Sequence, residues 1–306
     1  MKTVVVTGAN GFLGKALVKE LCSREINVIA IVHSLSDDDA SIASGVRYIP
    51  CDLKHYVNLC DDLSAYEPDV FYHLAWEGTS GPKRADEKIQ LSNVQGACDA
   101  ARLASRIGCR RFVFASSIME YEVDKAAKLM QDPGISAIYS TAKQTADYMS
   151  RIIAADNKIE FISGLISNIY GPGEKSPRLI NSSIRKLLKG ERLSLSPCEQ
   201  MYDFIYIDDA ARIFCEIGEK GKSGRIYYVG NRRVYPLKKF MEELRDVVAP
   251  DAVLGFGDIP FTGSGLTYNE FDKELLYNDT GFIPGVSFKK GVELTRDWIK
   301  AEGEYE

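Results

Sequence analysis

A tyrosine and a lysine four residues apart, Tyr139 and Lys143, have the spacing and chemistry of a proton-transfer pair. Side chains at positions i and i+4 meet on one face of a helix. The lysine ammonium then favours the phenolate form and lowers the pKa of the tyrosine toward the working pH. Such a tyrosine can donate or accept a proton at a carbonyl or hydroxyl group while a hydride moves to or from a nicotinamide. The pair therefore predicts redox chemistry at a carbon–oxygen bond.

The same spacing occurs at two other places, so the pattern needs its context. These other pairs are Tyr121 with Lys125 and Tyr235 with Lys239. Tyr235 is followed at once by Pro236, whereas Tyr139 opens a long segment of uninterrupted helical spacing. A strand-like run that ends in two serines also lies upstream of Tyr139. We therefore predict that Tyr139 is the acid or base and that Lys143 is its partner, which also binds ribose hydroxyls.

A glycine-rich loop, Gly8-Ala9-Asn10-Gly11-Phe12-Leu13-Gly14, follows the first apolar run of the chain. Gly8 permits a tight turn, Gly11 lets a pyrophosphate approach the backbone, and Gly14 lets a helix pack closely on a strand. The N-terminus of the following helix offers unpaired N–H groups and the positive end of a dipole. Because the glycines follow a strand and open a helix, we predict that they bind the phosphates of a dinucleotide.

Short β-branched runs alternate with longer segments of helical spacing in the first two thirds of the chain. The predicted strands are Thr3–Thr7, Asn27–Val32, Val46–Pro50, Val70–Leu74, Arg111–Ala115 and Glu160–Ile166, and the predicted helices include Phe12–Arg24, Glu87–Ile107 and Tyr139–Ala155. Near-continuous apolar strands indicate a sheet covered on both faces. The alternation predicts an α/β fold with a doubly wound parallel sheet of Rossmann type. Ligands of such sheets bind at the carboxyl ends of the strands.

The last third lacks this regular alternation, because glycines and prolines break it into short elements. The length of 306 residues also exceeds the ~250–300 residues at which one hydrophobic core stops growing. We predict an NAD(P)-binding domain over residues 1–167, which also includes about 202–230. A smaller substrate-binding lobe over residues 168–306 is expected to be interleaved with it.

Composition excludes several classes of protein. The chain is 45% hydrophobic and 26% charged, which is typical of globular proteins. A net charge of -5 argues against nucleic acid or an anionic membrane as the main partner. The apolar stretch at the start of the sequence is too short for a signal peptide. No apolar stretch elsewhere is long enough to span a membrane. Seven cysteines without a C-x-x-C pair indicate a cytoplasmic protein, and the three histidines have no metal-ligand spacing.

These motifs together resemble the extended branch of the short-chain dehydrogenase/reductase superfamily. That branch includes nucleotide-sugar epimerases, dehydratases and 4-keto reductases. The glycine spacing is Thr-Gly-x-x-Gly-x-x-Gly, the segment from Ser116 to Tyr121 resembles S-S-x-x-V-Y, and Ser167 to Gly173 contains N-x-Y-G-P. The resemblance covers nearly the whole chain. It implies that Ser117, four residues before Tyr121, is the catalytic serine that orients the reacting oxygen, with Ser116 as the alternative.

The resemblance also implies where the rest of the cofactor binds. Asp52 and Leu53 resemble an adenine-contacting pair, and Leu74-Ala75-Trp76 resembles a loop that runs along the cofactor. Asn93, on the predicted helix that follows this loop, matches a position that the wider superfamily uses to hold that helix and a water molecule. The predicted cofactor-binding residues are Gly8, Asn10, Gly11, Phe12, Leu13, Gly14, His33, Ser34, Asp52, Leu53, Leu74, Ala75, Trp76, Asn93, Tyr139 and Lys143.

The end of the second strand bears on the choice between NAD(H) and NADP(H). NAD enzymes usually place an acidic residue there, which binds the ribose 2′-hydroxyl. Here His33 and Ser34 occupy this place, and the next acidic residues are Asp37 to Asp39. Because His33 and Ser34 can bind a 2′-phosphate, the sequence favours NADP(H) over NAD(H).

The residues after the predicted catalytic serine distinguish between reactions. Dehydratases of this family place Asp-Glu there, whereas this chain has Ile118 and Met119, which cannot move a proton. Dehydration is therefore not expected. The resemblance places Ser117, Met119, Asn168 and Tyr202 against the substrate. Tyr202 replaces an arginine that often binds the substrate diphosphate, and the candidates to substitute for it are Arg178, Arg185, Arg232 and Arg233.

We therefore predict an NAD(P)-dependent oxidoreductase that acts on a sugar ring hydroxyl or ketone, as a nucleotide-sugar 4-keto reductase or epimerase. The expected partner is a nucleoside-diphosphate sugar, with no nucleic acid, membrane or metal. The alternatives are a reductase of a non-nucleotide carbonyl compound and a catalytically silent NAD(P)-binding protein. Relatives often dimerise through the helices equivalent to Glu87–Ile107 and Tyr139–Ala155, so a homodimer is expected.

Overall fold

The computed structural model describes residues 1–35, 45–130, 134–135, 137–261 and 265–303, which fall into two compact units. The sheet unit consists of Met1–Ile166, Ala211–Val229 and Glu274–Ile283. The second unit consists of Ser167–Ala210, Gly230–Lys273 and Pro284–Glu306. Helix α7 (Ile207–Lys220) contributes its first turn to the second unit and its remainder to the sheet unit.

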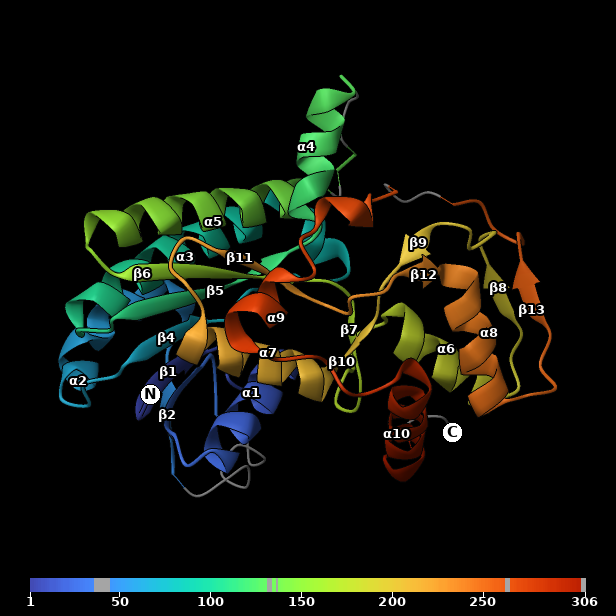
Figure 1. Cartoon of the computed structure of the whole chain (residues 1–306), viewed down its shortest axis with the longest axis horizontal. Helices are drawn as coiled ribbons and strands as arrows, with labels where there is room; N and C mark the ends of the chain where they lie inside the picture. Colours follow the sequence, from blue (N-terminus) through green and yellow to red (C-terminus); the bar gives the residue numbers. More distant parts are fainter. Residues whose placement is uncertain (36–44, 131–133, 136, 262–264, 304–306) are drawn as a thin grey trace. The chain divides into compact units, whose positions relative to one another are not determined.

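The sheet unit is built on seven parallel strands in the order β11-β6-β5-β4-β1-β2-β3 (Figure 1). The strands are β1 (Thr3–Thr7), β2 (Asn27–Val32), β3 (Val46–Pro50), β4 (Val70–His73), β5 (Arg111–Ser117), β6 (Glu160–Ile166) and β11 (Ile226–Val229). The predicted doubly wound parallel sheet is confirmed. The strand order reverses between β1 and β4, and ligands of such sheets bind at the carboxyl ends of the strands at this point.

All six predicted strands form, and β1, β2, β3 and β6 have the predicted bounds. Strand β4 ends one residue earlier than predicted, and β5 continues as far as Ser117. Strand β3 was predicted to be buried, but its side chains are only partly covered. The reason is its position at the edge of the sheet, where β2 is its single neighbour. Strand β11 was not among the predicted strands.

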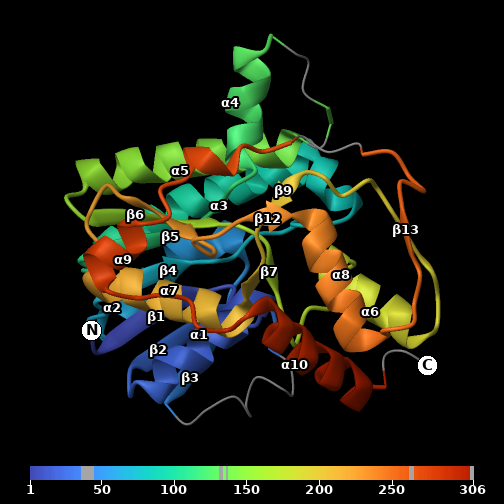
Figure 2. The ribbon, with the colours of Figure 1, turned by 45° about the vertical axis from the view of Figure 1, so that its right-hand side comes forward.

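Helices cover both faces of the sheet (Figures 1 and 2). Helices α3 (Glu87–Arg106) and α5 (Ala137–Asp156) pack side by side on one face. Helices α1 (Phe12–Ser23) and α7 cover the other. The further elements of this unit are η2 (Leu53–Leu59), α2 (Cys60–Ser64), η3 (Pro82–Ala85), α4 (Glu120–Lys128) and α9 (Leu275–Thr280).

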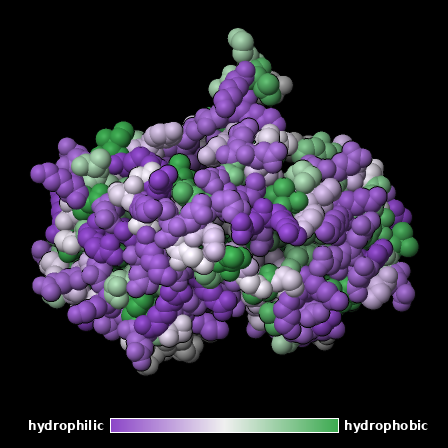
Figure 3. Space-filling model, viewed as in Figure 1, coloured by the Kyte–Doolittle hydropathy of each residue, from purple (hydrophilic) through white to green (hydrophobic). Residues whose placement is uncertain are grey.

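Helix α4 follows β5 directly and was not predicted. In both ribbon views it extends away from α5 and the sheet (Figures 1 and 2). The surface of the molecule is mainly hydrophilic in Figure 3, but apolar atoms gather at the far end of α4. Leu129 and Met130, which follow the helix, are both exposed.

In its described residues, the second unit contains three complete helices, the first turn of α7 and three pairs of short strands. The helices are α6 (Leu179–Leu188), α8 (Leu237–Val248) and α10 (Phe288–Ala301), with a 3₁₀ turn η4 (Tyr268–Glu270). The strand pairs are β7 (Ile169–Tyr170) with β10 (Ile205–Tyr206), β9 (Met201–Tyr202) with β12 (Tyr235–Pro236), and β8 (Leu193–Leu195) with β13 (Leu254–Phe256). Aromatic rings fill its core: the Phe240 ring lies 5.1 Å from Phe204 and 4.8 Å from Phe288.

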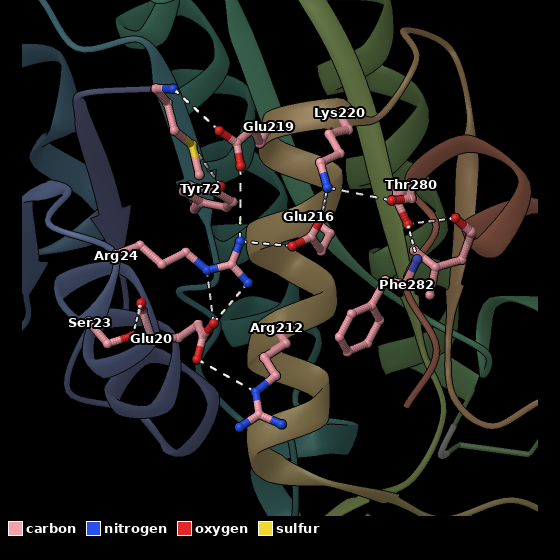
Figure 4. A network of polar contacts seen from close by, with 12 residues as sticks. Glu20, Ser23, Arg24, Tyr72, Arg212, Glu216, Glu219, Lys220, Thr280 and Phe282 are labelled. Carbon is pink, nitrogen blue, oxygen red and sulfur yellow. Dashed lines mark hydrogen bonds and ion pairs between the residues drawn. The ribbon is translucent and has the colours of Figure 1, made fainter. Parts of the chain in front are cut away.

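Ion pairs join α1 to α7 on the outer face of the sheet unit (Figure 4). Arg24 contacts Glu216 and Glu20, each at 2.8 Å. Lys220 contacts the other oxygen of Glu216 at 2.7 Å. Burial alone would raise the pKa of Glu216, but the hydrogen bonds from Lys220 and Arg24 hold it below its ordinary value. The folded chain therefore stabilises the charged form of this carboxylate.

Replacing Glu216 with glutamine removes the negative charge that Arg24 and Lys220 share. We expect the free energy of unfolding to fall by about 1 kcal/mol at neutral pH. Because the Glu216 pKa is lower in the folded than in the unfolded chain, this contribution is present above the ordinary carboxyl pKa and disappears as the pH falls through the folded value. Urea unfolding across this pH range measures it.

Glu219→Gln is the matched control, because Glu219 is more exposed and lies 4.0 Å from Arg24. It should lose less stability than Glu216→Gln. Equal losses of unfolding free energy in the two variants would contradict the stabilising role of the Glu216 charge. A loss in Glu216→Gln that persists in acid would contradict it as well.

Candidate active site

Two glycines shape the loop between β1 and α1 at places where a side chain would collide. Gly8 has a φ of +68°, and a Cβ there would lie 2.8 Å from the backbone of Ala75. A Cβ at Gly14 would lie 2.0 Å from the carbonyl oxygen of Gly8. Gly8 therefore lets β1 turn close to the loop after β4, and Gly14 lets α1 pack on that turn.

The N-terminus of α1 is open. Gly11 occupies the N-cap position and makes no side-chain hydrogen bond there. The first amides of the helix, those of Phe12 and Leu13, have no intrahelical acceptor and carry the positive end of the helix dipole. Asn10 Nδ2 donates to the Ser34 carbonyl at 3.1 Å, which ties the loop to the end of β2. This arrangement fits the pyrophosphate of a dinucleotide.

The end of β2 brings His33 next to Asp52. The exposed His33 ring places Nδ1 3.5 Å from an Asp52 oxygen. The other Asp52 oxygen caps η2 by accepting the Lys54 N–H at 2.9 Å. A carboxylate therefore lies beside His33, one of the two residues predicted to bind a 2′-phosphate. The acidic residues Asp37 to Asp39 lie outside the described residues.

Two predicted cofactor residues make packing contacts that fix the surrounding backbone. Leu53 fits against Gly96 of α3, where a Cβ would lie 2.3 Å from a Leu53 methyl group. The Ala75 N–H donates to Thr7 Oγ1 at 3.3 Å, which joins the loop after β4 to the end of β1.

Amide side chains from α3 hold the loop after β4, which contains Leu74, Ala75 and Trp76. Buried Asn93 accepts the Glu77 N–H at 2.9 Å and donates to the Glu77 carbonyl at 2.8 Å. Gln90 accepts the Trp76 indole N–H at 2.9 Å. The sequence offered no signal for Gln90 beyond its place one turn before Asn93. Together these amides fix the position of the Trp76 ring.

Tyr139 and Lys143 lie on one face of α5 and are both buried. Lys143 Nζ donates to the Ala115 carbonyl at 2.8 Å and lies 3.8 Å from the centre of the Trp76 ring. The Tyr139 ring meets Trp76 edge to face at 6.1 Å. The guanidinium carbon of Arg84, in η3, lies 4.4 Å from the centre of the Tyr139 ring. No sequence motif pointed to Arg84.

Burial shifts the pKa values of the ionisable groups around this pair. Burial lowers the pKa of Lys143, while Glu120 and Asp147 oppose this by favouring its charged form. Burial, with a contribution from Lys143, also lowers the pKa of His73 to about 3, so this ring is neutral. Among the described residues, Arg84 packs on the Tyr139 ring and Lys143 lies one turn further along the same helix, and cations stabilise an adjacent anion.

The two serines that end β5 have different partners. Ser116 donates its hydroxyl to buried Glu120 at 2.6 Å. Ser117 Oγ accepts the Met119 N–H at 3.2 Å, and among the described residues no acceptor takes its own proton. Met119, predicted to contact substrate, therefore reaches Ser117 through its main chain. Ser117 is the serine with a hydroxyl proton to donate.

Asn168 and Tyr202 lie together in the second unit. Asn168 Nδ2 donates to the Asp203 carbonyl at 2.9 Å and to the Tyr268 hydroxyl at 3.2 Å. The Tyr202 ring lies 5.2 Å from Phe204 and 6.4 Å from Tyr268. Tyr268 is a polar side chain that the sequence analysis missed, because it is 100 residues from Asn168 and belongs to no motif.

Two of the four arginines predicted as substitutes for the missing diphosphate ligand contact the chain itself. Arg178 Nε lies 3.2 Å from a Glu174 carboxylate oxygen, and Arg185 donates to the Glu174 carbonyl at 3.2 Å. Within the described ranges, no cluster of three His, Cys, Asp or Glu could hold a metal ion. No helix in that part of the chain is long and apolar enough to cross a membrane.

Comparison with known proteins agrees with this geometry. The model of the NAD dependent epimerase/dehydratase family matches residues 4–230, a span that includes the glycine loop and the Tyr139–Lys143 pair. The chain belongs to this family. The predicted resemblance to nucleotide-sugar enzymes of the extended short-chain superfamily is thereby confirmed.

Members of this family resemble the chain over almost its whole length. The CDP-abequose synthase of Salmonella typhimurium is 26% identical over 298 residues, which cover 95% of this chain and 96% of that protein. The dTDP-4-dehydro-6-deoxyglucose reductase of Escherichia coli is 25% identical and covers 95% of each chain. The structure of UDP-glucuronic acid 4-epimerase from Bacillus cereus in complex with NAD has a TM-score of 0.79, with 20% identity and coverage of 99% of this chain and 100% of that chain. The last comparison supports the fold.

Proposed function

We propose that the protein is an NAD(P)-dependent oxidoreductase that acts on a ring hydroxyl or ketone of a nucleotide-linked sugar. The observation that carries this proposal is the surroundings of Tyr139. Its ring packs against the Arg84 guanidinium, and Lys143 lies one turn further along the same helix. This combination supports a tyrosine that changes its protonation state during the reaction.

Four side chains take part in the proposed reaction. Tyr139 gives a proton to the reacting oxygen during reduction and removes one during oxidation. Lys143 and Arg84 stabilise the phenolate that remains after the proton has left. Ser117 donates its hydroxyl proton to the same oxygen and so orients it. The nicotinamide, when bound, supplies or accepts the hydride.

The residues that follow Ser117 bear on which reaction occurs. Elimination of water needs an acid and a base at the neighbouring carbon, and Ile118 and Met119 provide neither. Reduction of a 4-keto group and epimerisation both remain. The E. coli relative is named a reductase and the B. cereus neighbour a 4-epimerase. The lack of an acidic residue at the end of β2, which favours NADPH, supports reduction as the first choice.

The substrate is proposed to carry a nucleoside diphosphate, since the names of the similar proteins include CDP-, dTDP- and UDP-linked sugars or their products. Asn168, Tyr202 and Tyr268 support this by offering polar and aromatic groups to a sugar or a base. A non-nucleotide carbonyl substrate is the alternative. The third possibility, a silent binding protein, conflicts with the intact Ser117, Tyr139 and Lys143. We also propose a cytoplasmic location, because the cysteines are free thiols.

Replacing Tyr139 with phenylalanine removes the proton donor while keeping the ring that packs on Arg84 and Trp76. We expect kcat for reduction of a nucleotide 4-keto-sugar to fall by about 10²–10⁴-fold. The dissociation constant of the dinucleotide, measured by quenching of protein fluorescence, should change little. Steady-state oxidation of NAD(P)H measures the loss.

Tyr235→Phe is the control, because Tyr235 belongs to another Tyr-x-x-x-Lys pair and its ring also lies under a cation, with Lys239 Nζ 3.4 Å from its centre. Its turnover should match that of the wild type. Activity within a few-fold of wild type in Tyr139→Phe would exclude Tyr139 as the acid or base.

The cofactor preference proposed here is for NADP(H), on the basis of His33 and Ser34. Asp52 works against this preference, because its carboxylate lies next to His33. We expect His33→Ala to lower kcat/KM for NADPH by about 10-fold, the loss of one charge-assisted hydrogen bond, and to leave that for NADH unchanged. Asp52→Asn should raise kcat/KM for NADPH, because it removes a negative charge. Equal effects on both cofactors, or NAD carried tightly through purification, would contradict this proposal.

A homodimer through α3 and α5 is also proposed. Leu91 on α3 and Ile152 on α5 are 65% and 66% exposed, and Tyr148 and Met149 are exposed on the same helix as Ile152. Exposed apolar side chains on two adjacent helices are typical of an interface. A helix pair that packs on its symmetry mate would bury all of them.

Introducing a charge on this helix pair should separate the dimer. We expect Ile152→Lys to sediment as a monomer at concentrations where the wild type sediments as a dimer, since a lysine would be buried without a partner. Val253→Lys, at a 71% exposed site in the second unit, is the control and should remain dimeric. A monomeric wild type would contradict the proposal.

A further inference from the structure

A carboxylate is buried directly beside the serine pair at the end of β5. Glu120 is the first residue of α4 and is 8% exposed. One of its oxygens accepts the Ser116 hydroxyl at 2.6 Å and the Ser117 N–H at 3.1 Å. Burial of a charged group is costly unless hydrogen bonds and an opposite charge compensate it. The burial of the Glu120 carboxylate therefore needs groups that compensate its cost.

The charged groups that face Glu120 come from α5. They are Asp147, which raises the pKa of Glu120 further after burial has raised it, and Lys143, which lowers it. Asp147 has a cation of its own, because Arg151 lies 3.1 Å away, and it also accepts the Ser163 hydroxyl at 2.6 Å. The cation that faces Glu120 is therefore the ammonium of Lys143. Strand β5 contributes the two serines, which carry no charge.

We propose that Glu120 is a positioning residue of the reaction, which holds Ser117 by its main chain and supplies the negative charge that balances the buried Lys143 ammonium. This inference rests on the proposed roles of Ser117, Tyr139 and Lys143. It assigns a task to a residue that stands where the family motif S-S-x-x-V-Y has a valine.

The hydrogen bonds of Glu120 give the two serines different roles. Ser116 gives its proton to Glu120 and is thereby withdrawn from the substrate. The bond from the Ser117 N–H fixes the end of β5, and the Met119 N–H reaches Ser117 Oγ from the other side. No acceptor in the described part of the chain takes the Ser117 hydroxyl proton, and the hydrogen bond from the Met119 N–H fixes the position of Oγ. Such prior alignment is what a donor to a reacting oxygen requires.

The charge of Glu120 acts on the proton that Tyr139 and Lys143 exchange with solvent. A negative charge nearby makes any proton harder to remove. With Glu120 ionised, Lys143 remains an ammonium to higher pH despite its burial. Without that charge, Lys143 would lose its proton at a still lower pH, and a phenolate on Tyr139 would lose its stabilising cation earlier.

The variant Glu120→Gln separates the charge from the hydrogen bonds. The glutamine amide oxygen can still accept from Ser116 and from the Ser117 N–H, so the serine pair stays in place, but the negative charge is gone. We expect the alkaline limb of the kcat/KM profile for keto-sugar reduction to move to lower pH by about one unit. A purely structural role for Glu120 would lower stability and leave the pH profile unchanged.

Glu122→Gln is the matched control. Glu122 lies on the same helix and accepts the Ser140 hydroxyl of α5 at 3.0 Å, but it does not contact the serine pair. Its pH profile should coincide with that of the wild type. A profile for Glu120→Gln that also coincides with the wild type would overturn the inference.

A second measurement does not depend on the substrate. Acetic anhydride modifies only the neutral amine of a lysine, and mass spectrometry reports the extent of acetylation at Lys143. We expect the onset of modification to lie at lower pH in Glu120→Gln than in the wild type or in Glu122→Gln. An unchanged onset overturns the inference about Glu120. If the onset shifts in Glu120→Gln but the wild-type protein reduces no keto-sugar, the proposed function is contradicted and the inference about Glu120 stands.

Discussion

The site depends on keeping one ammonium group charged in the interior of the sheet unit. Lys143 is buried, and in place of water it meets the Ala115 carbonyl, the face of Trp76 and the negative charges of Glu120 and Asp147. Burial lowers the pKa of Lys143, and the two carboxylates keep it from falling further. Each of them is set by a different element, namely β5, the loop after β4, α4 and α5. The position of one charge thus requires the correct packing of four segments.

The same loop after β4 also connects the two halves of the proposed chemistry. Gly8 lets the end of β1 approach Ala75, so the phosphate-binding turn and the loop share a backbone contact. Asn93 and Gln90 then hold the loop from α3 and aim Trp76 at Lys143. A shift in any of these contacts would move the cofactor cradle and the proton-transfer pair together. The loops at the carboxyl ends of β1 and β4 are therefore structurally coupled.

The sequence was sufficient for features that depend on local spacing. The glycine triplet, the apolar runs of the strands and the i, i+4 pair Tyr139 and Lys143 are all of this kind. Features that depend on long-range packing were missed. Arg84 and Glu120 look like ordinary surface charges in the sequence, and only the fold brings them against Tyr139 and the serine pair. Tyr268 meets Asn168 across 100 residues, and the short strands of the second unit have no periodicity to detect.

The most direct test of this account follows a single hydrogen atom. The protein is incubated with a nucleoside-diphosphate 4-keto-sugar and NADPH or NADH deuterated at one face of the nicotinamide C4 position. The account predicts that the deuterium appears at C4 of the product sugar, from one of the two faces and not from the other, as seen by mass spectrometry and NMR. A product that carries no deuterium from either face, or a substrate that is returned unchanged, would contradict it.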